Sequence, residues 1–198
     1  MPFVPRWTLL SSGCAPLLLT AGWAVAGRLE GPGYDPVSQT ISVLAAYGSA
    51  GFWVMTGALL ALGVCHLLTA WGLRAAAPAG RVALGGGGVT ALLVALVPTP
   101  SSGGSLRHGT VAAAGFLLLA VWPVLAAHRH PTAPWALRPA PALAATALMC
   151  AGALWYVVEA NHQGAAGVAE RFVTSAQALW PFVVVTSCLR HRPRSIRS

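Results

Sequence analysis

Acidic residues are so few in this chain that each one is a candidate for chemistry. The sequence holds only four, Glu30, Asp35, Glu159 and Glu170. Asp35 lies in the polar segment GPGYDPVSQTIS, residues 31–42, between two long apolar stretches. Glu159 and Glu170 flank a second polar segment in the C-terminal third of the chain. A carboxyl group beside a histidine can act as a general acid or base, or can ligate a metal ion.

The same segments supply partners for these carboxyl groups. His108 follows Arg107 at the start of an apolar stretch, and His162 and Arg171 lie near the last two acids. Arginine can hold a phosphate or carboxylate group in bidentate fashion. We therefore take three residues as candidate catalytic groups, namely Asp35, His108 and Glu170. Five more are candidate substrate-binding residues, namely Ser38, Ser42, Arg107, His162 and Arg171. The sequence contains no H-x-x-x-H, H-E-x-x-H or C-x-x-C spacing, so no metal and no other cofactor is predicted.

Asp35 also has a purely structural interpretation. Aspartate is a preferred N-cap residue, and the following Pro36 suits the first position of a helix. Val37, Ile41 and Leu44 then recur at helical spacing, which predicts an amphipathic helix of about eleven residues ending at YGSAG. Capping that helix is the main role expected for Asp35, and the chemical role stays open beside it.

The other candidates have structural alternatives as well. Glutamate near a helix start, as at Glu170, is stabilised by the helix dipole without any catalytic duty. His108 can cap the helix that follows it, and Glu159 and His162 can be solvated loop residues. His66 is an ionisable residue well inside an apolar stretch, and such residues are functional candidates. A neutral histidine hydrogen-bonded to a neighbouring helix is the commoner explanation for His66.

The composition places the chain in a membrane. Charged residues make up 8% of the chain and hydrophobic residues 56%, with a mean hydropathy of +0.68. Soluble domains carry about 25% charged residues, so most of this surface must face lipid. The net charge of +8 would favour nucleic acid in a soluble protein. Here the basic residues, all arginine, lie in short loops and at the C-terminus, so no nucleic-acid partner is predicted.

Six apolar segments approach the roughly 20 residues that a spanning helix needs. They are residues 8–27, 52–73, 82–98, 108–127, 141–160 and 168–189. The predicted fold is an all-α six-transmembrane-helix bundle, a single membrane domain over 1–198 with a short amphipathic helix in its first outward loop. GGGG at 85–88 predicts a close helix-packing seam. The cysteines Cys14, Cys65, Cys150 and Cys188 all fall within spans and are expected to be free, buried, small apolar fillers.

The arginines predict the orientation of the bundle. Both termini and the loops after the second and fourth spans hold nine of the twelve, and the other loops hold only Arg28, Arg107 and Arg171. The positive-inside rule then places both termini in the cytoplasm and the protein in the cytoplasmic membrane. Residues 190–198 form a basic cytoplasmic tail that is suited to anionic lipid. AVAG at 24–27 leaves cleavage of the first span as a signal peptide open.

Four motifs carry a resemblance to a known family. They are GYDPVSQTISVLAA, GFWVMTGALLALG, RHGTVAAAGF and GVAERFVTSAQALW. The chain resembles the six-span membrane proteins, common in actinobacteria, that are grouped as domain of unknown function 998 (DUF998). The resemblance implies six helices, an ordered first outward loop, and recurring polar positions at Asp35, Ser38, Ser42, His108, Glu170 and Arg171. Relatives commonly have a basic pair after D-P, whereas this chain has Ser38 and Gln39, which weakens a phosphate-binding role there.

These observations favour a multi-pass membrane protein with an outward-facing polar site that binds or acts on a lipid or isoprenoid-like molecule. Membrane lipids are the expected partners, and the sequence leaves open whether the protein is an enzyme. One alternative is a structural or accessory membrane subunit without catalysis. Another is a small terpene-cyclase-like enzyme that uses an acidic residue as proton donor. A transporter is less expected, because charged groups at mid-membrane are absent. The ligand, the partner proteins and the oligomeric state are not predicted.

Overall fold

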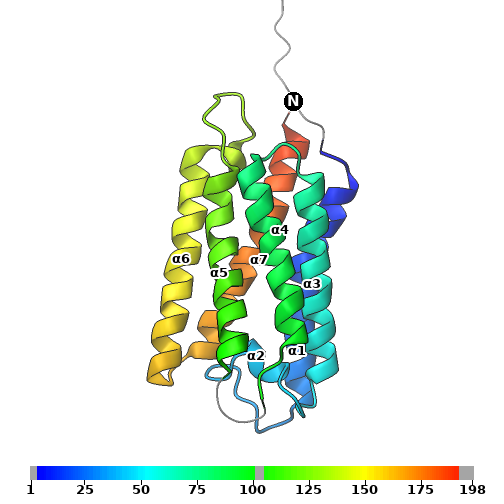
Figure 1. Ribbon diagram of the computed structural model, residues 1–198, viewed down its shortest axis with the longest axis vertical. Helices are drawn as coiled ribbons and strands as arrows, with labels where there is room; N and C mark the ends of the chain where they lie inside the picture. Colours follow the sequence, from blue (N-terminus) through cyan, green and yellow to red (C-terminus); the bar gives the residue numbers. More distant parts are fainter. Residues whose placement is uncertain (1–3, 101–104, 192–198) are drawn as a thin grey trace, which may run out of the picture.

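The computed structural model describes residues 4–100 and 105–191, and over these residues it is entirely helical (Figure 1). Its helices are α1 (Trp7–Leu29), α2 (Ile41–Leu44), α3 (Phe52–Gly72), α4 (Pro78–Leu96), α5 (Leu106–Ala126), the 3-10 helix η1 (Trp135–Leu137), α6 (Pro139–His162) and α7 (Ala166–Arg190). Six of them are long and apolar enough to cross a membrane. The predicted fold is therefore confirmed, including the short helix in the first loop, and the chain is a multi-pass membrane protein.

The helix α4 begins earlier than the predicted third span. Pro78 occupies its first turn, where the missing N–H of proline costs nothing. The extra turn carries Arg81, whose guanidinium donates to the carbonyls of Ala70 at 2.9 Å and Trp71 at 3.2 Å. These carbonyls belong to the last turn of α3, where backbone acceptors lack partners within the helix. Because α4 begins early, Arg81 can supply hydrogen bonds to the carbonyls at the end of α3.

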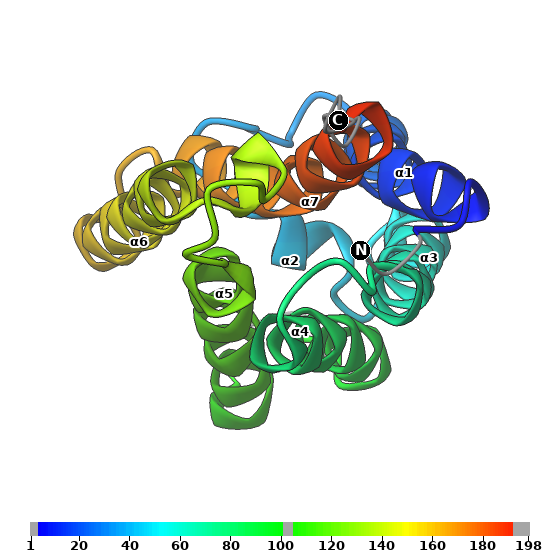
Figure 2. The ribbon, with the colours of Figure 1, turned by 90° about the horizontal axis from the view of Figure 1, so that it is seen from above.

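The six long helices form a closed ring. Each packs against the next long helix in the chain, and α7 packs against α1. Figure 2 shows this ring from above, with α2 inside it at one end of the bundle. We call that end the α2 end. Both ends of the described chain lie at the opposite end, which we call the terminal end (Figure 1).

The predicted glycine seam at 85–88 is divided between two helices: Gly88 packs against Gly63 of α3, whereas Gly86 and Gly87 face Leu118 and Leu119 of α5. A Cβ atom built on Gly63 would lie 2.7 Å from the Gly88 carbonyl oxygen, and one built on Gly88 would lie 2.8 Å from that of Gly63. Neither distance leaves room for a methyl group. Small residues thus let these two backbones touch, as expected of helices that pack within a membrane.

Two exposed tryptophans lie near the two ends of α3. Trp53 is 81% exposed and Trp71 is 65% exposed. They are eighteen positions apart (53 to 71), which corresponds to about 27 Å of helix. This length matches a hydrocarbon core of about 30 Å, and tryptophan favours both membrane interfaces. One interface therefore passes near Trp53 at the α2 end.

The segment after Asp35 differs from the predicted eleven-residue helix. Residues 36–38 form a turn, and only Ile41–Leu44 is α-helical, with Thr40 rather than Asp35 at its N-cap position. The Asp35 carboxylate accepts hydrogen bonds within the turn itself, from Val37 N at 3.0 Å and Ser38 Oγ at 2.6 Å. Arg171 binds carbonyl oxygens of this segment that a continuous helix would need for its own amides. These tertiary contacts therefore override the longer helix that the local sequence pattern predicts.

The four cysteines lie in four different helices, and all are unpaired. Their location within spans is as predicted, but the expected burial is wrong for Cys14 and Cys150, which are exposed on the bundle. Cys65 is buried, and Cys188 is half-buried. The sequence pattern places a cysteine on a helix, but it does not decide between a lipid-facing side and an inward one.

Candidate functional site

Glu170 anchors α2 inside the ring. Its side chain is 4% exposed and projects from the second turn of α7 toward α2. One carboxylate oxygen accepts a hydrogen bond from the Ile41 backbone N–H, and the other lies 3.2 Å from the Ser42 hydroxyl. Backbone donors at the start of a helix have no partner within the helix. Glu170 therefore supplies what the first turn of α2 lacks, which is more than the dipole role considered from the sequence.

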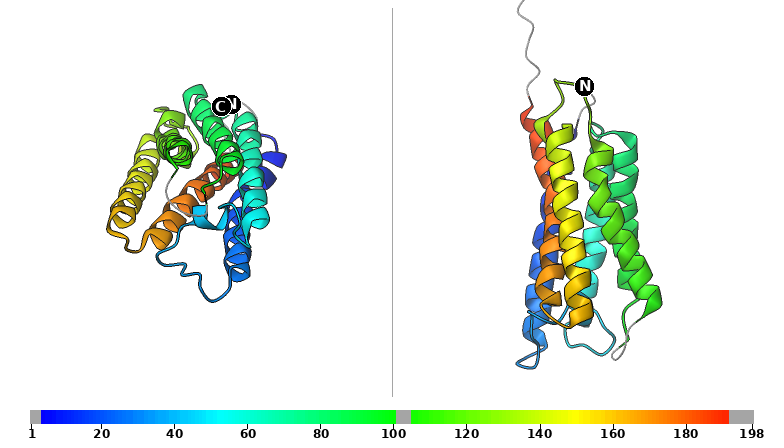
Figure 3. Two further views of the ribbon diagram at one scale, coloured as in Figure 1. Left: turned by 60° about the horizontal axis from the view of Figure 1, so that its bottom comes forward. Right: turned by 90° about the vertical axis from the view of Figure 1, so that its left-hand side faces the viewer.

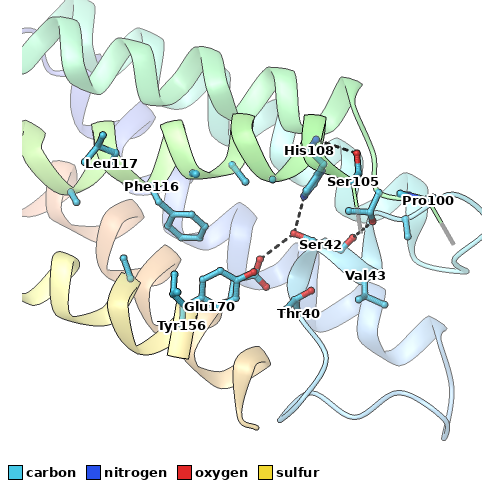
Figure 4. A pocket seen from close by; sticks show the side chains of 18 of the residues that line it. Thr40, Ser42, Val43, Pro100, Ser105, His108, Phe116, Leu117, Tyr156 and Glu170 are labelled. Atoms are coloured by element: carbon cyan, nitrogen blue, oxygen red, sulfur yellow. Dashed lines mark hydrogen bonds between the residues drawn. The ribbon is translucent and has the colours of Figure 1, made fainter. Parts of the chain in front are cut away.

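His108 approaches Ser42 from the opposite side (Figure 4). Its Nε2 lies 3.2 Å from Ser42 Oγ, and its Nδ1 lies 2.9 Å from the Val97 carbonyl oxygen. The His108 ring is buried at 6% exposure. Its own position is fixed by Ser105, the N-cap residue of α5, whose hydroxyl accepts from the His108 N–H at 3.3 Å. Ser42 thus lies between an imidazole and a carboxyl group.

Glu170, Ser42 and His108 form a hydrogen-bonded line, and its donors and acceptors restrict which side chain carries each proton. The Val97 carbonyl only accepts, so Nδ1 of His108 carries a proton. In a neutral ring Nε2 is then an acceptor, and it receives the Ser42 hydroxyl proton. Ser42 has one proton, so it donates to His108 or to Glu170, but not to both. A neutral His108 therefore goes with a protonated Glu170, and a charged His108 with an ionised Glu170.

A cavity of about 860 Å³ opens from this line of side chains. It lies between α2, α5, α6 and α7. The lining residues that matter here are Thr40, Ser42, His108, Phe116, Tyr156 and Glu170. Its polar groups gather at the α2 end, and its remaining walls are alanine, aromatic and aliphatic side chains. The volume falls within the range of about 300–1,000 Å³ that is typical of small-molecule sites.

The cavity runs along the axis of α5, into the depth of the membrane, and it opens sideways between α5 and α6. Toward the α2 end α5 tilts away from α6 (Figures 2 and 3). Leu117 on α5 and Val157 on α6 line the cavity and are 63% and 51% exposed. From His108 to Ala120 the lining covers twelve positions of α5, about 18 Å of helix. This is slightly more than half of a hydrocarbon core of about 30 Å, or one leaflet.

Arg171 faces away from the cavity and holds the first loop. Its guanidinium donates to the carbonyls of Pro36 at 2.9 Å and Gln39 at 3.0 Å, and to the Tyr34 hydroxyl. It also lies 5.3 Å from the ring centre of Trp23, in a cation–π arrangement. Burial raises the pKa of Tyr34, which keeps its phenol neutral. The two terminal nitrogens of Arg171 therefore both donate to the protein itself.

The other predicted site residues are not brought to the cavity. Asp35 and Ser38 bind each other in an exposed turn, and the Ser38 hydroxyl lowers the pKa of Asp35, with the Val37 N–H adding to the effect. Arg107 and His162 are exposed, and neither lines the cavity. Of the eight predicted residues, the structure thus joins three, Ser42, His108 and Glu170, in one hydrogen-bonded line.

Two residues outside the predicted site differ from expectation. Glu159 is not a solvated loop residue: its carboxylate accepts from Ala165 N at 2.7 Å and from Trp155 Nε1 at 3.1 Å, which closes the turn between α6 and α7. His66 is 1% exposed, and neither ring nitrogen has a hydrogen-bond partner among the described residues. The interhelical hydrogen bond expected for His66 is therefore not present in this part of the chain.

Sequence reasoning did not assign Thr40, Val97 and Phe116 to the site. Phe116 follows His108 at i+8 on α5, with Ala112 between them, so helical periodicity alone could have placed it on the same wall. No sequence signal marks Val97, because it contributes a backbone carbonyl at the C-cap of α4. Thr40 lines the cavity only because the first loop folds into the ring, which local pattern does not encode.

Comparison with known proteins gives one family. A family model described as "Protein of unknown function (DUF998)" matches residues 14–187, which is most of the chain. The matched region contains α2, α5, α6 and most of α7, and it contains every residue that lines the cavity. No curated protein and no solved structure matches the chain.

Proposed function

Since the chain belongs to the DUF998 family, whose description gives no activity, we propose that it binds a single lipid or isoprenoid-like molecule in the cavity between α5 and α6. The polar end of the ligand lies against Ser42, His108 and Glu170, and its apolar chain runs along α5. The observation that carries this proposal is the shape of the cavity, which is polar at one end, apolar along its length and open to the side.

The depth of the cavity supports a membrane ligand. Its polar end lies at the α2 end, where Trp53 marks the interface, and its apolar part covers about 18 Å of α5. A lipid in one leaflet has its head group and chain at these same depths. A water-soluble ligand would gain nothing from a wall of exposed aliphatic side chains such as Leu117 and Val157.

The polar end favours a group that both donates and accepts hydrogen bonds. The line from Glu170 through Ser42 to His108 offers acceptors and donors but no arginine, because Arg171 is used by the first loop. A phosphate would find no bidentate cation among the lining residues that the structure describes. Hydroxyl, ester or carboxylic acid groups fit this end better.

The test is to identify what co-purifies with the full chain in mild detergent. We expect a stoichiometric lipid or isoprenoid by mass spectrometry of the folded protein. Ala153 lines the cavity on α6, so the ring of Ala153→Phe should obstruct the apolar part of the cavity and lower the bound ligand at least tenfold. Ala151→Phe is the matched control, because Ala151 lies on α6 at nearly the same depth, is exposed and does not line the cavity.

Two results would contradict the proposal. One is a ligand that stays bound in Ala153→Phe as well as in Ala151→Phe, since the ligand would then lie elsewhere. The other is ligand-free protein that always purifies with the same second chain, which would favour the accessory-subunit alternative.

A further inference from the structure

The Ser42 hydroxyl is held by the arrangement that activates serine nucleophiles. We propose that Ser42 is a nucleophile and His108 its general base, and that the ligand of the cavity is a lipid with a carboxylic ester, which the site cleaves. This inference rests on the proposed lipid site and adds a substrate class and a reaction to it.

The geometry of His108 is that of a general base. Its Nε2 lies 3.2 Å from Ser42 Oγ, and the Val97 carbonyl holds the proton on Nδ1. In serine hydrolases a third group orients the imidazole in the same way, so that its free lone pair faces the hydroxyl. Here a backbone carbonyl has that orienting role. The burial of His108 fixes the ring further.

Glu170 acts on the other side of Ser42. It positions the serine by binding both the Ile41 N–H and the Ser42 hydroxyl. With a neutral His108, the proton count of this line requires a protonated Glu170, which donates to Ser42 Oγ and leaves the serine proton directed at His108 Nε2. Glu170 is therefore a positioning residue for Ser42, and His108 takes the serine proton as the general base.

Two hydroxyl groups are placed to stabilise the negative charge on the ester oxygen. Thr40 and Tyr156 line the cavity beside Ser42 and Glu170 (Figure 4). The Thr40 side chain makes no capping hydrogen bond to α2, and Tyr156 lines the cavity on α6. Both are therefore able to donate to a ligand.

The reaction balances with water as the only co-reactant. Ser42 Oγ attacks the ester carbonyl carbon, and its proton passes to His108 Nε2. The bond from that carbon to the alcohol oxygen breaks, and the alcohol leaves with the proton from His108. Water then attacks the acyl-serine, again giving its proton to His108, and the fatty acid leaves as Ser42 regains its proton. The position near the interface gives water access to the serine.

A second hydroxyl–imidazole pair provides an internal control. His130 Nδ1 lies 2.7 Å from Thr132 Oγ1, closer than in the Ser42 pair. These two residues lie in an exposed loop at the terminal end and line none of the cavities described. The proposal therefore predicts that Ser42 reacts and Thr132 does not, because the cavity distinguishes Ser42.

The experiment uses a long-chain alkyl fluorophosphonate on the full chain in mild detergent, after the bound lipid has been recorded and exchanged for detergent. Attack by Ser42 releases fluoride and leaves a phosphonyl adduct, seen by intact mass and located by peptide mapping. We expect one adduct, on Ser42. It should be absent in Ser42→Ala, unchanged in Thr132→Ala, and formed about 100-fold more slowly in His108→Gln. Melting temperatures show that each variant is folded.

Each of the other possible results contradicts either the proposed nucleophile or the proposed lipid site. Wild-type protein that carries a lipid but forms no adduct overturns the nucleophile and leaves the lipid site standing. An adduct that persists in Ser42→Ala, or that forms equally fast in folded His108→Gln, also overturns it. Wild-type protein without any lipid contradicts the proposed function separately, since that result is recorded before the fluorophosphonate is added.

Discussion

Arg171 on α7 and Tyr34 in the first loop lie 137 positions apart in sequence, and the Arg171 guanidinium donates a hydrogen bond to the Tyr34 hydroxyl. The same guanidinium donates to the carbonyls of Pro36 and Gln39. Together these bonds draw the loop over the α2 end of the ring. The neighbouring Glu170 then binds α2 itself, so two adjacent residues of α7 hold successive parts of one loop.

Loss of Arg171 should therefore loosen the loop. A hydrogen bond to a charged group contributes about 1.5–3 kcal/mol, and lysine cannot reproduce the planar set of donors. We expect Arg171→Lys to lower the free energy of unfolding by about 2 kcal/mol, and to speed hydrogen exchange over residues 34–46. Arg107→Ala, at an exposed position, should change stability by less than about 0.5 kcal/mol. Equal losses of stability in Arg171→Lys and Arg107→Ala would contradict the role of Arg171 in holding the first loop.

Asp35 is expected to be structural. Among the described residues its carboxylate binds only its own turn, and it is exposed away from the cavity. Asp35→Asn keeps an acceptor for the Val37 N–H and should leave bound ligand unchanged, whereas Asp35→Ala should melt lower in the same detergent. If Asp35→Asn is folded yet loses bound ligand or fluorophosphonate labelling, then the carboxylate acts on a ligand after all.

The same contact predicts a pH dependence. The Ser38 hydroxyl and the Val37 N–H lower the pKa of Asp35 below its ordinary value. Its stabilising effect is therefore fully present above the ordinary pKa of about 3.9, and is lost as the pH falls through the lower pKa of the folded state. The difference in melting temperature between the parent and Asp35→Ala should therefore begin to shrink as the pH falls below about 3.9. A difference that stays the same would contradict this account.

The long helices could be predicted from the sequence, because their length and apolar composition follow from the bilayer. The structure of the first loop could not, because it depends on tertiary contacts. Each long helix was readable because its segment is apolar over the length of a bilayer. The helix after Asp35 was predicted too long, because nothing local shows that Arg171 takes the carbonyls of Pro36 and Gln39. In the same way Ser42, His108 and Glu170 were named as candidates, but only the ring brings them into line.

The contact between α3 and α4 gives a test of the packing. Gly88→Ala places a methyl group against the Gly63 carbonyl and should cost about 1–3 kcal/mol through overpacking. Gly57→Ala is the matched control on α3, because a Cβ atom there meets nothing within 4 Å. It should keep stability or raise it by up to about 1 kcal/mol through helix propensity. If Gly88→Ala and Gly57→Ala have the same melting temperature, then the backbones of α3 and α4 separate at little cost in free energy.

The last prediction concerns orientation, on which the identity of the cavity's leaflet depends. The arginines of the terminal end and of the tail, whose residues 192–198 lie outside the described structure, predict that this end faces the cytoplasm. His162 and Thr132 are exposed at opposite ends of the bundle. Because all four native cysteines lie within helices that face lipid or the interior, a membrane-impermeant maleimide should not label the parent in intact cells. It should label His162→Cys at once and Thr132→Cys only after the cells are opened. The reverse pattern would place the cavity in the cytoplasmic leaflet, and the lipid site would then draw on the inner rather than the outer lipids.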